Sequence, residues 1–360
     1  MFDVAIIGAG VAGCTAAIAL AATHRVVLID KQAEPPERIG ESLAPAARRI
    51  FHQLGLLAEF NQQPHLLSQG MQSYWGSEQV QVVDNIRNPD GFGWHLNRQL
   101  FEAFLREFAR LRGVECRWPV KLTASYYDQD HWCLTTDSCG YIKAKFVIDA
   151  GGRQAPFARQ QGMQREHIDK LIACWATIPD ESTNRMGLIA STDIGWWYSV
   201  VTPNNRRVIT LQTDSDLIDA EIKKDLIRFI QLALCSPPMA QLLHGLDFTA
   251  KADGAVYHGV TAANTTRLQQ VAGKCWVALG DAAISFDPLS SQGIFNAMAS
   301  AMQLADLLRS QKEVQAEYTK QIEQIWQYYV IHKNTYYRQE NRWRDAPFWR
   351  RRHSANVVGH

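Results

Sequence analysis

Residues 2–31, FDVAIIGAGVAGCTAAIALAATHRVVLIDK, constrain the fold more than any other part of the chain. They predict a buried strand, a glycine turn, a helix and a second strand. The glycines have the spacing GxGxxG, which permits a tight turn, a close approach of the backbone to a pyrophosphate and close packing of helix on strand. The second strand ends on an acidic residue, where such a unit binds a ribose hydroxyl. We assign to this dinucleotide site Gly8, Gly10, Gly13, Asp30 and Lys31.

The same N-terminal segment allows two other interpretations, a membrane or signal segment and a packing turn without a nucleotide. Residues 4–22 are almost wholly apolar and near the length of a membrane span. They are dominated by Ala and Gly and lack a basic flank and a cleavage pattern, so we expect neither a signal sequence nor a membrane anchor. A glycine-rich packing turn without a nucleotide is the alternative for the GxGxxG spacing.

The charge and the cysteines limit the partners and sites to expect. The formal net charge is +1, which provides no field to recruit nucleic acid or anionic lipid. The seven cysteines include no CxxC pair, a pattern that favours a reduced, cytoplasmic protein. No HExxH motif or Cys/His cluster indicates a metal site. We therefore expect no nucleic-acid partner, no membrane partner and no metal.

A second segment, GDAAISFDPLSSQGIFNAMASA at 280–301, places a carboxylate after the apolar run CWVALG and then starts a helix beyond a polar turn. The sequence contains no second GxGxxG, so an architecture with two nucleotide-binding domains is not expected. We expect this segment to supply the other half of a flavin site. We expect the carboxylate to bind the ribityl chain of FAD and the helix N-terminus to face the flavin ring, where reduction places negative charge. The alternative is a capped core helix. The residues assigned here are Gly280, Asp281, Pro288, Gln292, Gly293 and Ile294.

Four motifs together resemble the flavoprotein monooxygenases of the p-hydroxybenzoate-hydroxylase-like fold, in their flavin-dependent-halogenase-like branch. The motifs are GAGVAG at 8–13, RIGESLAP at 38–45, DAGGR at 149–153 and GDAA…DPLSSQG at 280–293. The resemblance implies FAD, oxygenation chemistry at the flavin, and a substrate domain inserted into the FAD domain. It adds to the cofactor site Glu41, Ser42, Arg98 and Asp149.

The chain departs from the halogenases of this branch in its lysines. Those enzymes carry an essential lysine one strand beyond the GES-type motif, whereas this sequence has no lysine between Lys31 and Lys121. Ser290 stands where tryptophan halogenases place a glutamate, and their WxWxIP motif is only echoed by GWWYSVVTP at 195–203. Halogenation is therefore not favoured.

A narrower resemblance points to the flavoprotein maturases of lysine and glycine oxidases, which carry cysteine tryptophylquinone. It is carried by GWWYS with a following TDSD, by DPLSSQG and by the terminal YYRQENRWRDAPFWRRRH. It implies an FAD-dependent monooxygenase that oxygenates a tryptophan of the oxidase precursor, using molecular oxygen and an electron donor for which NADPH stays open. The alternatives are a flavin-dependent hydroxylase or halogenase of a free small aromatic molecule, and a flavin-binding chaperone with structural FAD.

The predicted architecture is α/β, with a Rossmann-like FAD-binding domain, an inserted antiparallel-sheet substrate domain and a C-terminal helical region. The FAD domain is expected at 1–165 and 266–310. The substrate domain is expected at 166–265, with strands around 70–96, and the helical region with its basic tail at 311–360. Its tail is interpreted as a helix clamped on the FAD domain with a solvated basic end, or as a docking surface for a protein partner.

The aromatic strand residues Trp175, Trp196, Trp197 and Tyr198 are candidates to line the substrate site. Neighbours on a strand point to opposite faces, so one of Trp196 and Trp197 is expected in the core. Catalytic residues are not assigned, since Glu41 and His95 are candidates for a general base only by residue type.

Overall fold

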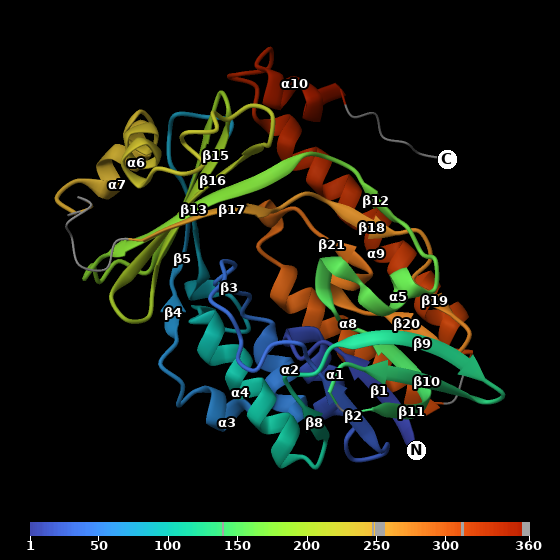
Figure 1. Cartoon of the computed structure of the whole chain (residues 1–360). Coiled ribbons are helices and arrows are strands. Elements are labelled where there is room, and N and C mark those ends of the chain that lie inside the picture. Colours follow the sequence, from blue (N-terminus) through green and yellow to red (C-terminus); the bar gives the residue numbers. More distant parts are fainter. Residues whose placement is uncertain (139, 247, 249–255, 311–312, 355–360) are drawn as a thin grey trace.

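The structure is a computed structural model of the 360-residue chain, and it describes residues 1–138, 140–246, 248, 256–310 and 313–354. Five parallel strands in the order β8–β2–β1–β11–β20 form the first sheet (Figure 1). The buried Val and Ile side chains of β1 and β2 explain why these two segments lie inside it. These strands are β1 (Phe2–Ile7), β2 (Val26–Ile29), β8 (Glu115–Arg117), β11 (Tyr141–Asp149) and β20 (Trp276–Ala278).

Helices and an antiparallel extension complete this Rossmann-like unit. Helix α1 packs against both α4 and α8, and the Asn97 side chain caps α4 by accepting the Leu100 N–H. Strands β9 and β10 extend the sheet from β11, and β19 pairs with β20. The elements are α1 (Val11–Leu20), α4 (Arg98–Leu111), α8 (Gly293–Ser310), β9 (Leu122–Asp128), β10 (His131–Thr136) and β19 (Ala272–Gly273).

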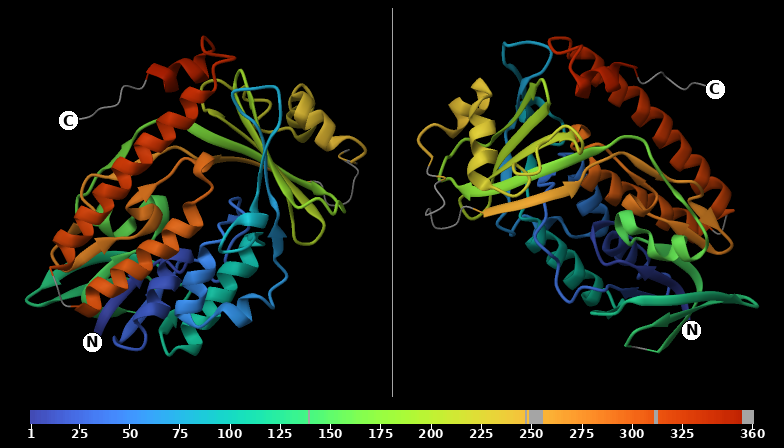
Figure 2. Two further views of the ribbon diagram at one scale, coloured as in Figure 1. Left: turned by 180° about the vertical axis from the view of Figure 1, so that it is seen from behind. Right: turned by 45° about the horizontal axis from the view of Figure 1, so that its top comes forward.

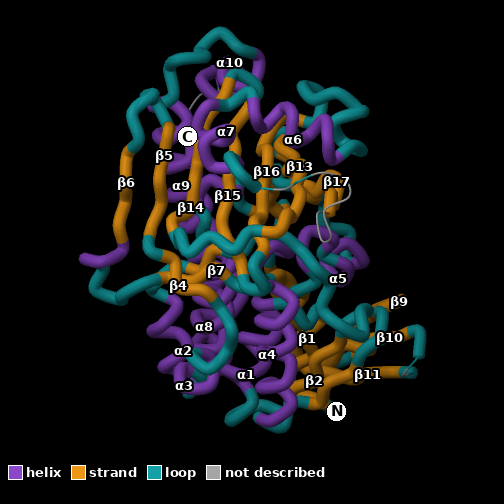
Figure 3. The backbone as a smooth tube through the Cα atoms, turned by 90° about the vertical axis from the view of Figure 1, so that its left-hand side faces the viewer, coloured by secondary structure: helices purple, strands orange, loops and turns teal. Residues whose placement is uncertain are grey.

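A second sheet of seven strands has the order β17–β13–β16–β15–β14–β5–β6 (Figure 3). All pairs are antiparallel except β14 with β5. Asn204 and Asn205, both with positive φ, form the turn between β15 and β16, as expected for a tight hairpin. The strands are β5 (Gly70–Tyr74), β6 (Gln81–Asp84), β13 (Leu171–Pro179), β14 (Met186–Thr192), β15 (Gly195–Thr202), β16 (Arg206–Asp214) and β17 (Val256–Ala262).

The two faces of the seven-stranded sheet have different cover. One face packs under α6 and α7 in a core that includes Trp197 and Phe229. The opposite face packs against the C-terminal helices in a core that includes Trp75, Trp196 and Trp349. The prediction that one of the paired tryptophans is core is confirmed, since Trp197 lies on the far face from the cavity described below. The helices are α6 (Leu226–Leu234) and α7 (Pro237–Leu243).

Two small sheets and three short helices join the large sheets. One has the order β3–β7–β4 and the other β12–β18–β21. The elements are β3 (Ser42–Leu43), α2 (Ala47–Leu54), α3 (Leu57–Phe60), β4 (Leu66–Ser68), β7 (Gly93–His95), α5 (Pro156–Gln160), β12 (Arg165–His167), β18 (Thr266–Leu268) and β21 (Ile284–Ser285). The predicted α/β class with an antiparallel second layer is confirmed, whereas the domain boundaries stay predictions.

Helices α9 (Val314–Gln339) and α10 (Pro347–Ser354) run along the molecule from the first sheet to the second (Figure 2). The indole N–H of Trp75 donates to Tyr336 O (2.8 Å), and that of Trp349 donates to Thr192 O (2.6 Å). The expected helix on the FAD domain is present, because α9 contacts α8 and β19. The expected solvated basic end is found only in part. Arg344 and Arg350 are exposed, whereas Arg342 and Arg352 reach acceptors on the seven-stranded sheet. Residues 355–360 of the predicted tail lie outside the described residues.

Within the described ranges, no helix taken alone has the length and apolar character needed to cross a bilayer. In the same ranges one pair of helices, α6 and α7, meets the criterion together by length and composition, and the pair is bent by 117° at its junction.

Candidate functional site

A cavity of about 1210 Å³ lies between the Rossmann-like unit and the seven-stranded sheet. This volume exceeds the range of about 300–1,000 Å³ that is usual for a single small ligand. The cavity brings together most of the residues assigned from the sequence, namely Gly8, Gly10, Asp30, Lys31, Glu41, Ser42, Arg98, Asp281, Pro288, Gln292, Gly293 and Ile294. Gly13, Asp149 and Gly280 do not line it but lie in the turns that shape it.

The glycine turn at the floor of the cavity has two kinds of glycine. A Cβ at Gly8 would lie 2.3 Å from Ala150 O, and one at Gly13 would lie 1.9 Å from Gly8 O, so packing requires both. A Cβ at Gly10 would meet nothing closer than 3.9 Å, because this position opens into the cavity. Gly10 provides no side-chain cap for α1, which leaves first-turn N–H groups for a ligand. The turn therefore forms a cradle that a pyrophosphate fits and that a side chain would fill.

This difference between the glycines is testable. Gly10→Ala is expected to lower FAD affinity at least ~10-fold while leaving the melting temperature of the apoprotein unchanged, because its methyl group would occupy only ligand space. Gly13→Ala is expected to lower both, because its methyl group would clash with the backbone. FAD bound per chain and thermal unfolding without FAD measure the two effects. Wild-type FAD affinity in Gly10→Ala would contradict this site.

A buried ion pair organises the loop beside the glycine turn. The Arg106 Nη2 lies 3.3 Å from Asp30 Oδ2, and both side chains are largely buried. Arg106 also donates to the carbonyls of Ala9 (3.1 Å), Gln32 (3.0 Å) and Ala33 (3.1 Å). Arg106 was not predicted from the sequence. The available signal was its spacing on the predicted helix, four residues after Glu102 and eight after Arg98, since such residues share one face.

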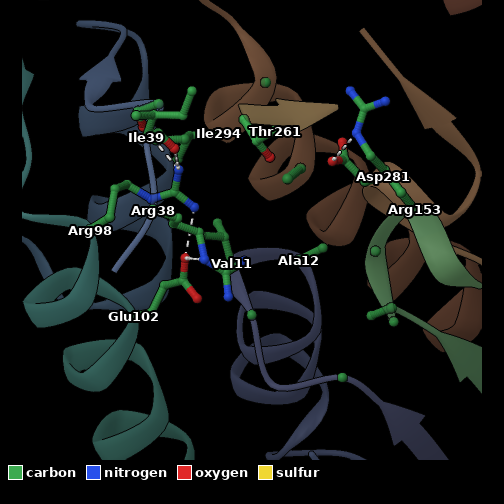
Figure 4. A pocket seen from close by; sticks show the side chains of 18 of the residues that line it. Val11, Ala12, Arg38, Ile39, Arg98, Glu102, Arg153, Thr261, Asp281 and Ile294 are labelled. Carbon is green, nitrogen blue, oxygen red and sulfur yellow. Dashed lines mark hydrogen bonds and ion pairs between the residues drawn. The ribbon is translucent and has the colours of Figure 1, made fainter. Parts of the chain in front are cut away.

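A second cluster holds the segment 38–42 against the cavity (Figure 4). Arg98 donates to the carbonyls of Ile39 (3.0 Å) and Gly40 (2.9 Å) and to Glu102 Oε1 (2.7 Å). Arg38 Nε lies 3.6 Å from the same Glu102 oxygen. Arg98 thus has a clear role in shaping the cavity wall. Its Nη1 and Nη2 bond to protein acceptors, while its buried Nε has no partner among the described residues.

The DAGGR turn is ordered by a carboxylate beneath it. Asp149 is fully buried and accepts N–H donors from Gly151 (3.0 Å), Phe157 (2.9 Å) and Ala158 (2.8 Å). Burial raises the pKa of Asp149 to about 6, although these donors oppose the shift. The structure thus shows Asp149 shaping the turn, and its direct contact with a cofactor stays a prediction.

Two of the motifs predicted separately meet across the cavity. Arg153 Nε, from the DAGGR turn, lies 3.9 Å from Asp281 Oδ2, and Arg153 also donates to Asn264 O (2.6 Å) (Figure 4). The Asp281 side chain is about half exposed, so its carboxylate is available to a ligand. The position of this carboxylate fits the expected contact with the hydroxyl groups of the ribityl chain of FAD.

The polar turn before α8 is held from below by Asp287. Asp287 is buried, and it accepts the Leu289 N–H (2.9 Å) and the Tyr337 O–H (2.8 Å). Burial raises the pKa of this carboxyl. The turn and the first residues of α8 line the cavity, so the N-terminus of an 18-residue helix faces the ligand space.

The seven-stranded sheet forms an aromatic wall, which we define as Trp175, Trp196, Tyr198, Thr210, Gln212 and Thr261. Trp196 donates its indole N–H to Tyr337 OH (3.1 Å), so the C-terminal helix fixes its orientation. Gln212 is buried, and no partner for its Oε1 exists among the described atoms. Buried polar atoms in native structures are almost always hydrogen-bonded, so this oxygen can accept a donor from a ligand or a water in the cavity.

The two base candidates have different environments. His95 is fully buried, does not line the cavity, and contacts Val201 O through Nδ1 (3.0 Å). Burial lowers its pKa to about 4, which keeps the ring neutral. Glu41 lines the cavity, and burial raises its pKa to about 7. Of these two side chains, Glu41 alone is placed to contact a ligand.

Away from the cavity, the described residues include one cluster with metal-ligating side chains. The ligand atoms of Asp128, His131 and Cys133, at the β9–β10 hairpin, lie within 4.8 Å of one another. None of the three lines the cavity. The cluster therefore has no part in the site described here.

Comparisons with known proteins agree with this geometry. A family model described as FAD binding domain matches residues 1–220, and one described as tryptophan halogenase matches residues 239–359. The FAD-dependent oxidoreductase LodB of Marinomonas mediterranea is 28% identical over 380 residues, covering 100% of this chain and 99% of LodB.

Two solved structures share the fold. The flavin-dependent halogenase CmlS superposes with a TM-score of 0.85 at 24% identity, covering 99% of this chain and 68% of CmlS. The peptidyl tryptophan dihydroxylase QhpG superposes with a TM-score of 0.77 at 19% identity, covering 100% of this chain and 80% of QhpG. The cradle, the helix N-termini and the unpartnered polar atoms fit FAD. The chain thus belongs to the FAD binding domain family, as an FAD-dependent oxidoreductase of the monooxygenase type with the fold of the flavin-dependent halogenases.

Proposed function

We propose that this enzyme oxygenates a tryptophan side chain of a precursor protein during biosynthesis of cysteine tryptophylquinone in a glycine or lysine oxidase. The observation that carries the proposal is the continuity of one cavity from the dinucleotide cradle to the aromatic wall. The likeness to LodB over the whole chain supports it, as does the shared fold with QhpG, which is described as essential for tryptophylquinone cofactor biogenesis.

The lysines of the cavity favour oxygenation over halogenation. Among the described lining residues the lysines are Lys31 and Lys121, both beside Asp30, at the dinucleotide end. Lys31 follows Asp30 in the chain, and Val120 N donates to Asp30 O (2.7 Å). The aromatic wall contributes no lysine to direct a halogenating species onto the ring.

The chain's own residues supply position and a dry site. When bound, FAD supplies the redox chemistry that activates molecular oxygen with electrons from a donor such as NADPH. An indole ring is already nucleophilic, so holding it against the aromatic wall and excluding water accounts for most of what the protein must do. Halogenation or hydroxylation of a free small aromatic molecule is the second candidate, favoured by the halogenase fold of CmlS.

Intact mass of a quinoprotein-oxidase precursor, co-expressed with and without this enzyme, tests the proposal. We expect a mass gain of one or more oxygen atoms on one tryptophan, present with the wild-type enzyme and absent with the FAD-poor Gly10→Ala variant. An unchanged precursor beside an FAD-loaded enzyme would contradict the proposal for that precursor. Free indoles and phenols, with and without halide, would then test the second candidate.

A further inference from the structure

Glu41 is a buried carboxyl at the junction between the cofactor cradle and the aromatic wall. It is 4% exposed and lines the cavity directly before β3. The next residue, Ser42, hydrogen-bonds through Oγ to Tyr198 OH (2.7 Å), and Tyr198 belongs to the aromatic wall. The carboxyl therefore lies where the flavin end of the cavity meets the substrate sheet.

The carboxyl is incompletely satisfied by the protein. Its Oε2 is buried, and no hydrogen-bond partner for it exists among the described residues. Leaving a buried polar oxygen unpaired is costly, more so for a charged group, so such oxygens in native sites commonly await a ligand donor. The nearby cation, Arg98, donates through Nη1 to two carbonyls and through Nη2 to Glu102. Its Nε is also buried without a partner and makes no hydrogen bond to Glu41 among the described residues. A donor in the cavity can supply the missing hydrogen bond to Oε2.

We propose that Glu41 accepts the ring N–H of the aromatic substrate and takes its proton as oxygen is added to the ring. This inference rests on the proposed function. The ring carbon supplies the electron pair of the new C–O bond, and the ring nitrogen becomes positive. The N–H electron pair then returns to the ring, and the proton moves to Oε2 of Glu41. Molecular oxygen, reduced through FAD by the electron donor, provides the oxygen atom and releases the other atom as water.

The surroundings of Glu41 suit this role at neutral pH. Burial holds its pKa near 7, so the carboxylate form becomes dominant as the pH rises through this value. Three other titratable groups are close to it or on the neighbouring strand. Arg98 stays charged, Tyr198 stays neutral because burial and Glu41 raise its pKa, and His95 on β7 stays neutral. A rate that rises through pH 7 is therefore assigned to Glu41.

Binding of indole and 1-methylindole to the FAD-loaded enzyme tests the acceptor role without any precursor. A site built around an N–H rejects an analogue that lacks it. We expect wild-type protein to bind indole at least ~10-fold more tightly than 1-methylindole at pH 8, by flavin difference absorbance. Glu41→Leu, compared in protein that is loaded with FAD, should abolish this preference. Glu34→Gln is the control, because Glu34 is an exposed carboxylate that does not line the cavity, and it should behave as wild type.

Oxygenation of the precursor tests the proton transfer. In FAD-loaded protein, Glu41→Gln should slow oxygenation ~100-fold, and the rate should no longer rise through pH 7. Equal binding of the two probes by the wild type, or binding of neither, would overturn the inference. A Glu41→Gln variant with a changed FAD affinity or flavin spectrum, but an unchanged preference for indole over 1-methylindole, would also overturn the inference. Glu41 would then act on the cofactor.

The two proposals fail separately. An unmodified precursor beside an intact indole preference that Glu41→Leu removes would refute the proposed function and leave the acceptor role standing. A modified precursor with wild-type kinetics in Glu41→Gln would refute the role of Glu41 alone.

Discussion

Arg106→Ala is expected to abolish stable FAD binding and to lower the free energy of unfolding by about 3–5 kcal/mol. The substitution removes the buried partner of Asp30 and leaves the carbonyls of Ala9, Gln32 and Ala33 without their donor. These groups connect the glycine turn to the chain after β2, so both sides of the dinucleotide cradle lose their common support. Urea unfolding of the apoprotein and FAD bound per chain measure the two losses.

Arg110→Ala is the matched control for this prediction. Arg110 lies one turn further along α4, and its partner Glu107 is also exposed. Exposed pairs contribute little, so the variant should be indistinguishable from wild type in stability and FAD content. Full FAD occupancy in Arg106→Ala would show that the cradle does not depend on this residue.

The second large effect is expected at Asp214, at the end of β16. Its buried carboxylate accepts hydrogen bonds from Arg352 Nη1 (3.2 Å) and Nη2 (2.8 Å) and from Arg351 Nη1 (2.9 Å). Asp214→Ala would leave the buried Arg352 charge without its carboxylate, and should lower the free energy of unfolding by about 3–5 kcal/mol. Helix α10 should also become accessible to protease, because these pairs fasten it to the seven-stranded sheet.

Asp216 provides a control two residues away. It pairs with the same Arg351, at 2.8 Å, but its side chain is 41% exposed. The hydrogen bond from Arg351 lowers the pKa of Asp216, yet pairs as exposed as this one are screened by water. Asp216→Ala should therefore unfold at the same urea concentration as wild type. Equal destabilisation by the two variants would refute the importance of burial at this joint.

The residues that could be predicted are those whose role is set by local spacing. The GxGxxG spacing and the acidic residue at the end of β2 predict the dinucleotide-binding unit, because its strand, turn and helix are consecutive in the chain. Alternation along β15 likewise predicted that Trp196 and Trp197 would separate.

Residues whose role depends on distant partners were not predictable in the same way. Arg106 acts on carbonyls about 75 to 100 residues away in the chain. In the basic tail, Arg351 and Arg352 pair with Asp214, more than 130 residues earlier in the chain. The sequence of the tail alone does not predict this partner. Asp149 ends its strand as expected, but spacing alone does not say whether a carboxylate points into a cavity or beneath a turn.

The hydroxyl of Tyr337 has a consequence for how the enzyme is made. It donates to Asp287 below the flavin turn and accepts the N–H of Trp196 in the substrate wall. Tyr337 thus links these two parts of the cavity. Because it follows both of them in the chain, a ribosome must synthesise α9 before this link between turn and wall can form.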